Sequence, residues 1–188
     1  MGVIIVIGLP GAGKTSVIGD LKGDFVTENL GDMMGEIAKG RGHAKDKDRL
    51  RSLGKREYAQ DIDAAFKEVS KIRRNMVLTT HVAGENEGRF LPSLKPRDLT
   101  LLKTIKALIF ITAPTRDIME RRRNDKSRKR AIEPKGIIDA HRMVTLSTMS
   151  YYASFINIPL YIIDNAEGRL EHARKQFREI VGKTFGEK

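Results

Sequence analysis

The 188-residue sequence contains no cysteine and no tryptophan, and only 6% of its residues are aromatic. The lack of cysteine excludes a disulfide scaffold, a thiolate zinc site and a cysteine nucleophile. Its longest apolar runs, residues 3–7 and 107–111, fall far short of the roughly 20 residues that span a bilayer. The sequence therefore predicts a cytoplasmic protein without a secretory signal or a membrane span. Hydrophobic residues, at 40%, suffice for a core and exclude global disorder.

Positive charge is concentrated in two segments. Residues 39–56 carry eight Lys and Arg against two Asp, and residues 121–130 carry seven against one Asp, so each segment has a balance of +6. The whole chain has +11, which leaves −1 for the other 160 residues. Such segments attract nucleotides, nucleic acid or acidic lipid, although two solvated loops would carry the same charge.

Short β-branched runs alternate with helical patterns along the chain. The runs predict strands at residues 3–7, 25–27, 76–80, 107–111 and 160–163. Helical spacing predicts helices at residues 14–21, 46–73, 116–123, 134–155 and 167–181, with Thr115 as a cap. Residues 84–97, which contain Gly and Pro, are predicted to form a loop. This alternation predicts an α/β fold in which helices flank a five-stranded parallel sheet.

The most specific motif follows the first predicted strand and leads into a helix. It reads Gly8-Leu9-Pro10-Gly11-Ala12-Gly13-Lys14-Thr15-Ser16 and matches the P-loop pattern G-x-x-x-x-G-K-[ST]. The glycines allow backbone N–H groups to surround phosphate, Lys14 reaches the β- and γ-phosphates, and the Thr15 hydroxyl binds Mg²⁺. A chance glycine-rich turn is the alternative, but the strand and helix on either side favour a nucleoside-triphosphate site.

The rest of the sequence favours a kinase over a switch GTPase. It lacks the base-reading and switch motifs of a GTPase, and it has a cluster of arginines at residues 121–130, beside a predicted loop. Transfer between two nucleotides brings several phosphates together, and mobile arginines neutralise them. A solvated helix face is the alternative for these arginines.

Further motifs follow the P-loop in a recognisable order. They are Asn29-Leu30-Gly31-Asp32-Met33-Met34, Gly42-His43-Ala44-Lys45-Asp46-Lys47-Asp48, Gln60-Asp61-Ile62-Asp63-Ala64-Ala65, Thr80-His81, Phe90-Leu91-Pro92 and Arg128-Lys129-Arg130. In this order the sequence resembles the archaeal-type adenylate kinases over nearly its whole length. The resemblance implies reversible, Mg²⁺-dependent transfer from ATP, or another NTP, to AMP by a homotrimer.

The resemblance also implies how the chain is divided. One P-loop kinase domain, residues 1–188, would comprise a core (residues 1–30, 75–120 and 134–188), an NMP-binding insertion (residues 31–74) and a short arginine-rich lid (residues 121–133).

The same resemblance implies a role for each matching residue. The P-loop residues Gly8, Pro10, Gly11, Ala12, Gly13, Lys14, Thr15 and Ser16 would hold the ATP phosphates, with Thr15 on the metal. The AMP side would comprise Asp32, Met33, Met34, Arg51, Gln60, Asp63, Thr80, His81 and Arg89. Transfer would be catalysed by Lys14, Arg121, Arg123, Arg128, Arg130 and Arg142, with the choice between Arg121 and Arg123 left open.

The sequence departs from the family pattern after the third predicted strand. Family members carry Asp-Thr-His there, whereas this chain reads Thr79-Thr80-His81 and lacks the Asp that holds Mg²⁺ through water. Glu85 stands where a basic residue is expected, and Arg89 is the candidate to replace it. A histidine satisfied at a strand end is the alternative for His81.

Two other functions remain open on the sequence. One is a P-loop kinase for another NMP or small acceptor, and the other is a nucleotide-gated RNA- or ribosome-associated factor. The scarcity of aromatic residues argues against nucleic acid as a partner, because single-stranded RNA is usually bound by stacking. The large apolar residues of the helix predicted at 134–155 are expected to pack in the core, with a trimer contact as the alternative: Met143, Met149, Tyr151, Tyr152 and Phe155.

Overall fold

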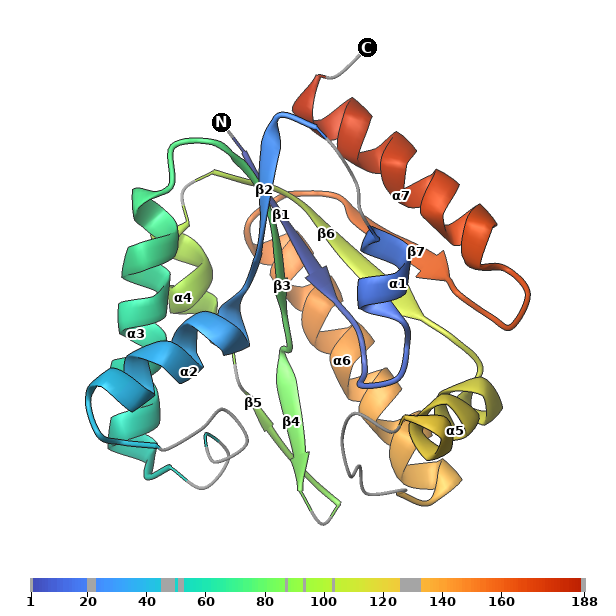
Figure 1. Cartoon of the computed structure of the whole chain (residues 1–188), viewed down its shortest axis with the longest axis horizontal. Helices are drawn as coiled ribbons and strands as arrows, with labels where there is room; N and C mark the ends of the chain where they lie inside the picture. Colours follow the sequence, from blue (N-terminus) through green and yellow to red (C-terminus); the bar gives the residue numbers. More distant parts are fainter. Residues whose placement is uncertain are drawn as a thin grey trace.

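A computed structural model describes residues 2–19, 23–44, 50, 53–86, 88–92, 94–102, 104–125 and 133–186. Its central sheet has the strand order β2-β3-β1-β6-β7, and every neighbouring pair is parallel (Figure 1). The strands are β1 (Val3–Ile7), β2 (Phe25–Asn29), β3 (Asn75–Thr80), β6 (Ile105–Thr112) and β7 (Leu160–Asp164). All five predicted strands and the α/β class are confirmed.

The middle strand, β1, is buried on both faces of the sheet. Ile5 and Ile7 belong to one hydrophobic cluster, and Ile4 and Val6 belong to a second. Successive side chains of a strand point to opposite faces, so an unbroken β-branched run fits a strand that is covered by helices on both sides.

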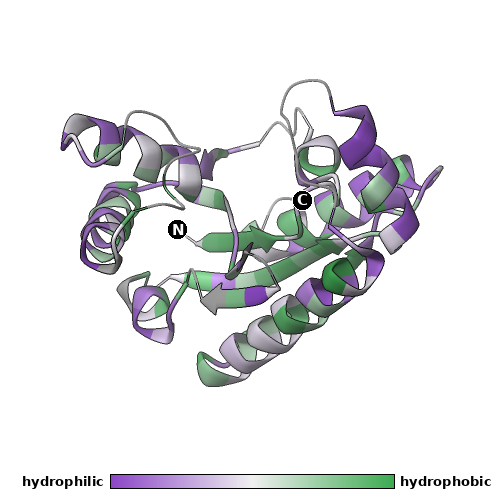
Figure 2. Ribbon diagram, turned by 90° about the horizontal axis from the view of Figure 1, so that it is seen from below, coloured by the Kyte–Doolittle hydropathy of each residue, from purple (hydrophilic) through white to green (hydrophobic). Residues whose placement is uncertain are grey.

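Helices cover both faces of this sheet. Two helices contribute to the cluster around Ile4: α1 (Lys14–Ile18) and α7 (Leu170–Phe185). Five contribute to the cluster around Ile5: α2 (Leu30–Gly40), α3 (Lys55–Lys71), α4 (Pro96–Leu101), α5 (Thr115–Asn124) and α6 (Lys135–Phe155). Figure 2 shows mostly hydrophobic central strands, with hydrophilic residues gathered on the surrounding helices. In the described part of the chain, none of the helices is both long and apolar enough to cross a membrane.

The prediction of a loop at residues 84–97 is wrong. The structure has an antiparallel hairpin there, formed by β4 (Ala83–Asn86) and β5 (Arg89–Pro92), followed by α4. The hairpin is held from α6, where His141 Nε2 donates to the Ala83 carbonyl at 3.1 Å and the His141 ring lies 5.6 Å from that of Phe90. Burial lowers the pKa of His141, although the hydrogen bond to Ala83 acts in the opposite direction, and in the neutral ring the Nε2–H tautomer makes this contact. The hairpin therefore depends on a tertiary contact.

The start of α3 and the cap of α5 also differ from the prediction. A helix was expected from residue 46, but α3 begins at Lys55, because Glu57 accepts a hydrogen bond from the Gly54 N–H at 2.9 Å and caps the helix there. Residues 45–49 and 51–52 lie outside the described part of the chain. Thr115 does not cap α5, since Pro114 is the N-cap and the Thr115 hydroxyl donates to Asp139 on α6 instead.

The large apolar residues of α6 divide into two groups. Met149 and Tyr152 are buried, as predicted for core residues. Met143, Tyr151 and Phe155 are exposed, with relative accessibilities of 68%, 55% and 54%, so the prediction of core packing is wrong for these three.

We expect Phe177→Ala to destabilise the protein by about 3–5 kcal/mol, because it removes a fully buried ring from the cluster between α7 and the sheet. Ile162→Ala is the control, because Ile162 of β7 is 55% exposed. Urea unfolding followed by circular dichroism measures both free energies. Equal losses in the two variants would contradict the position of α7 on the sheet.

Candidate nucleotide-binding site

The P-loop lies at the carboxyl end of β1, between this strand and α1 (Figure 1). A turn forms where the Ala12 N–H donates to the Leu9 carbonyl at 3.1 Å. Lys14 folds back over the loop, and its Nζ donates to the Gly8 carbonyl at 2.6 Å and to the Leu9 carbonyl at 3.4 Å. The ammonium group is therefore held over the loop backbone that a P-loop uses for phosphate.

Two glycines of the loop are required by close contacts. A Cβ on Gly8 would lie 2.4 Å from the Ile111 carbonyl oxygen of β6. A Cβ on Gly13 would lie 2.3 Å from Asn165 Nδ2, and Gly13 also has a φ of 85° that L side chains rarely adopt. The loop can follow this path only with glycine at both positions.

Arg121 of α5 lies against the loop at Gly13. Its Nη1 is 3.6 Å from the position of a Cβ built on Gly13, and its Nη2 donates to the Asn165 carbonyl at 3.0 Å. A second bond from Nη2 reaches Glu167 Oε2 at 3.2 Å. Arg123, the other arginine left open by the sequence, is exposed. Of the two, Arg121 is the one in contact with the P-loop.

Arg122 belongs to the arginine cluster but was not among the predicted catalytic residues. It is the most buried of the three consecutive arginines. Its Nε donates to the Pro10 carbonyl at 2.9 Å, and its Nη1 forms an ion pair with Glu133. Its exposure is only 5%. Helical spacing would have indicated this, because Arg122 comes four residues after the fully buried Ile118 and so shares its face of α5.

Arg142 of α6 is held at the start of α5. Its Nη1 donates to the Ala113 carbonyl at 3.2 Å, and its Nη2 donates to Asp139 Oδ1 at 2.9 Å. Hydrogen bonds from Thr115 and Lys135 hold the pKa of Asp139 below its ordinary value, so this carboxylate stays charged beside Arg142. Arg128 and Arg130, two other predicted catalytic residues, lie outside the described residues.

The first predicted acceptor residues lie where β2 passes into α2. Asn29 caps this helix, because its Oδ1 accepts a hydrogen bond from the Asp32 N–H at 3.0 Å. Asp32 is exposed and Met33 is half-buried, whereas Met34 is buried in the core cluster. Asp32 and Met33 therefore lie at the surface of the carboxyl edge, whereas Met34 packs in the core.

A second group lies at the end of the neighbouring strand. Thr80, the last residue of β3, is buried and donates from Oγ1 to the His81 carbonyl at 3.4 Å, whereas His81 itself is exposed. Because Asn29 pairs with Thr79 in parallel register, these residues share the carboxyl edge with Asp32. Arg89 is exposed at the start of β5.

The predicted acceptor residues of α3 contact arginines from other elements. Arg41 Nη1 donates to the Gln60 carbonyl at 3.0 Å, and Arg97 forms an ion pair with Asp63 at 3.2 Å. Arg51, the predicted ligand of the AMP phosphate, lies outside the described residues.

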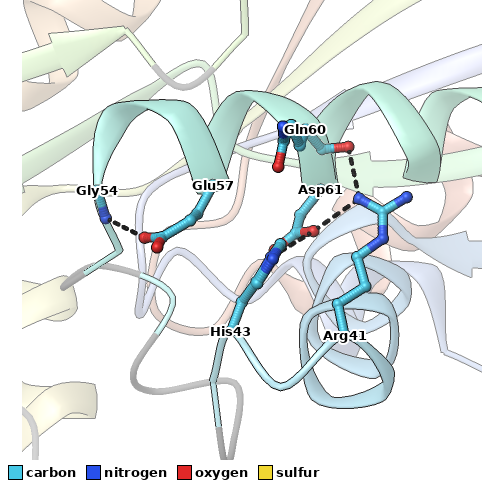
Figure 3. Close-up of polar contacts among 6 residues, drawn as sticks. All are labelled: Arg41, His43, Gly54, Glu57, Gln60 and Asp61. Carbon is cyan, nitrogen blue, oxygen red and sulfur yellow. Dashed lines mark hydrogen bonds and ion pairs between the residues drawn. The ribbon is translucent and has the colours of Figure 1, made fainter.

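Asp61 joins the end of α2 to α3 through a buried carboxylate (Figure 3). Its exposure is 0%, and its Oδ1 accepts from Arg41 Nη1 at 2.9 Å while His43 Nδ1 lies 2.9 Å from Oδ2. Buried carboxylates are rarely stable without such partners. The cluster therefore anchors the segment after α2 to α3, the helix that carries Gln60 and Asp63.

Comparison with known proteins identifies the family. A family model described as an AAA domain matches residues 7–139. The adenylate kinase of Methanothermobacter thermautotrophicus is 31% identical over 96% of this chain and 100% of its own length. The chain belongs to the adenylate kinase family. The adenylate kinase of Methanopyrus kandleri is 27% identical over 95% of this chain and 97% of its own.

Solved structures agree with the fold of a P-loop kinase. Shikimate kinase from Acinetobacter baumannii has a TM-score of 0.62 at 19% identity, over 100% of this chain and 95% of its own. Shikimate kinase from Aquifex aeolicus has a TM-score of 0.55 at 19% identity, over 98% of this chain and 99% of its own. At these identities the likeness concerns the fold, and the predicted α/β fold with a five-stranded parallel sheet flanked by helices is confirmed.

A magnesium site in this adenylate kinase family member would depend on few protein ligands. Thr15 and Ser16 are exposed at the first turn of α1, so the Thr15 hydroxyl is available as a hard oxygen ligand. Thr79, in place of the family Asp, donates from Oγ1 to the Glu28 carbonyl at 3.2 Å. Among the described residues there is no group of three or more His, Cys, Asp or Glu that could hold a metal. These residues fit Mg²⁺ held largely by substrate phosphates, as is usual for this ion.

We expect Asp61→Asn to destabilise the protein by about 1.5–3 kcal/mol, because the amide cannot replace a buried carboxylate between Arg41 and His43. Asp24→Asn is the matched control: its ion pair with Arg74 is exposed, so its loss should cost less than about 1 kcal/mol. Urea unfolding at pH 7 compares the two. A loss for Asp61→Asn no larger than the control's would show that the cluster does not hold α2 to α3.

Proposed function

We propose that this protein is an adenylate kinase in activity as well as in family, and that it transfers the terminal phosphoryl group of ATP to AMP. One observation carries the proposal. In a chain that is similar to an adenylate kinase over nearly its whole length, Arg121 and Arg122 of α5 contact the P-loop. The neighbouring carboxyl ends of β2 and β3 present the residues proposed for the acceptor.

In the proposed reaction an oxygen of the AMP phosphate attacks the terminal phosphorus of ATP. A bond forms between that oxygen and phosphorus, the bond from phosphorus to the bridging oxygen breaks, and two ADP molecules result. The attacking group is already an anion, so the protein need not supply a general base. Catalysis then consists of positioning the two nucleotides and stabilising charge.

We assign the donor phosphates to residues Gly8–Ser16. Lys14 Nζ, held near the Gly8 carbonyl, is proposed to exchange this contact for an anionic phosphate oxygen, which is a stronger acceptor than a carbonyl. Arg121, and with it Arg142, Arg128 and Arg130, is proposed to neutralise the transferring group. Mg²⁺, when bound, neutralises charge on the donor phosphates, and the Thr15 hydroxyl is the proposed protein ligand.

The acceptor is assigned to the side of the sheet occupied by β2, β3 and α3. Asp32, Met33, Thr80 and His81 lie at one edge, Gln60 and Asp63 lie on α3, and Arg89 lies on β5. Arg51 is proposed to hold the AMP phosphate, because a guanidinium group can bind phosphate in a bidentate manner.

We also propose that the protein acts in the cytoplasm as a homotrimer. Exposed Met143, Tyr151 and Phe155 support an assembly, because water-exposed large apolar side chains on one helix favour contact with another surface. Light scattering after size exclusion measures the mass, with about three times 21.1 kDa expected. A monomer at micromolar concentration would contradict this assignment.

Activity is tested by measuring ADP formation with a panel of NTP donors and NMP acceptors. We expect ATP and AMP to be the fastest pair and Lys14→Ala to lower kcat at least about a hundredfold, because it removes a charge that stabilises the transition state. Lys183→Ala, an exposed lysine on α7, is the control and should retain full activity. If AMP is not phosphorylated while another small acceptor is, the proposed acceptor is wrong.

A further inference from the structure

Asn165, which the resemblance to the family did not assign, connects three parts of the donor side. It follows β7 directly and is only 3% exposed. Its N–H donates to the Thr112 carbonyl of β6 at 2.8 Å, its Nδ2 donates to the Ala12 carbonyl at 2.9 Å, and its own carbonyl accepts from Arg121 at 3.0 Å. One buried residue therefore joins the sheet, the P-loop and α5.

The contact with the P-loop is unusually close. Asn165 Nδ2 is 2.3 Å from the position that a Cβ on Gly13 would occupy, and Arg121 Nη1 is 3.6 Å from the same point. The carboxamide and the guanidinium group thus lie side by side on the loop backbone. They approach it only because Gly13 has no side chain.

Two polar atoms of this pair have no hydrogen-bond partner among the described residues. They are Arg121 Nη1 and Asn165 Oδ1, and both are buried. Buried side-chain polar atoms are nearly always hydrogen-bonded, so an unsatisfied pair needs an explanation. An arrangement kept for function rather than for stability is one such explanation.

The turn that carries Asn165 is also attached to α5. The Glu167 N–H donates to Asp117 Oδ2 at 2.8 Å, and Asp117 is 4% exposed. Glu167 Oε2 in turn accepts from Arg121. The position of Asn165 is therefore determined by the sheet on one side and by α5 on the other.

We propose that Asn165 is a positioning residue of the donor site, which orients the Ala12–Gly13 peptide and places Arg121 beside it. The inference rests on the proposed function, but only on its assignment of the P-loop to the donor triphosphate. A peptide unit is planar and trans, so its C=O and N–H point in opposite directions. Holding the Ala12 carbonyl on Asn165 directs the Gly13 N–H away from Asn165, and P-loops bind phosphate through such N–H groups.

The test uses two variants of Asn165 and one matched control. Asn165→Ala removes the donor to Ala12, and Asn165→Asp replaces it with an oxygen of the same size. Asn75→Ala is the control, because Asn75 also makes one side-chain hydrogen bond to a backbone group, accepting from the Gly2 N–H at 2.9 Å. Asn75 is the first residue of β3 and therefore lies at the amino end of the parallel strands, away from the P-loop at their carboxyl end.

ATP affinity is measured first by calorimetry on the full chain without any acceptor. We expect the dissociation constant for ATP to rise roughly three- to tenfold in Asn165→Ala, the range for one lost hydrogen bond. The rise should be larger in Asn165→Asp, because the carboxylate repels both the Ala12 carbonyl and the triphosphate. In steady-state assays the KM for ATP should rise while the KM for AMP stays within twofold of wild type.

A purely structural role predicts a different pattern. Asn165→Ala would then lower the melting temperature and the active fraction, with both KM values and the ATP dissociation constant unchanged, and this result would overturn the proposal. An equal loss of ATP affinity in Asn75→Ala would also overturn the proposal.

If Asn165→Ala does not fold, Asn165→Ser is used in its place, because serine keeps a small polar side chain. If wild-type protein does not phosphorylate AMP, the proposed function fails, but ATP affinity still decides the role of Asn165.

Discussion

Residues Val3–Ile7 are buried on both faces of the parallel sheet, and the position of the P-loop, the proposed donor site, depends on this burial. A strand covered by helices on both sides is held rigidly, so the loop at its carboxyl end starts from a well-determined point. The close approach of Gly8 to the Ile111 carbonyl extends this constraint into the loop itself. The P-loop therefore begins inside the packed core, and helix α1 and the turn after β7 then complete it.

The positive charge of the chain has several different functions. Arg122 is neutralised by Glu133 and supports the P-loop from inside the fold, and Arg142 is held by Asp139. Arg41 forms an ion pair with the buried carboxylate of Asp61 between α2 and α3. Part of the excess charge is thus structural. Arg121, which has one buried nitrogen unpaired among the described residues, is the arginine that we propose to contact the donor nucleotide.

The strands were predictable because each is a short β-branched run, and the P-loop was predictable because its pattern is local. The hairpin β4–β5 was missed, since it contains glycines and is held by His141 from a distant helix. Helical spacing from Ile118 would have identified Arg122. Asn165 and Asp61 carry no such signal, because their partners lie 153 and 18 to 20 residues away in the chain.

The sequence by itself determined the class of fold, the phosphate-binding loop and the family. Strand patterns, turn glycines and the ordered motifs are local signals, because each depends only on residues that are close together in the chain. Only the tertiary structure decided which of Arg121, Arg122 and Arg123 contact the loop, that Met34 is a core residue, and that Asn165 reaches Ala12. The physical reason is that burial and hydrogen bonding depend on which elements meet in space. Neighbouring residues in the chain, such as three successive arginines, can therefore have three different environments.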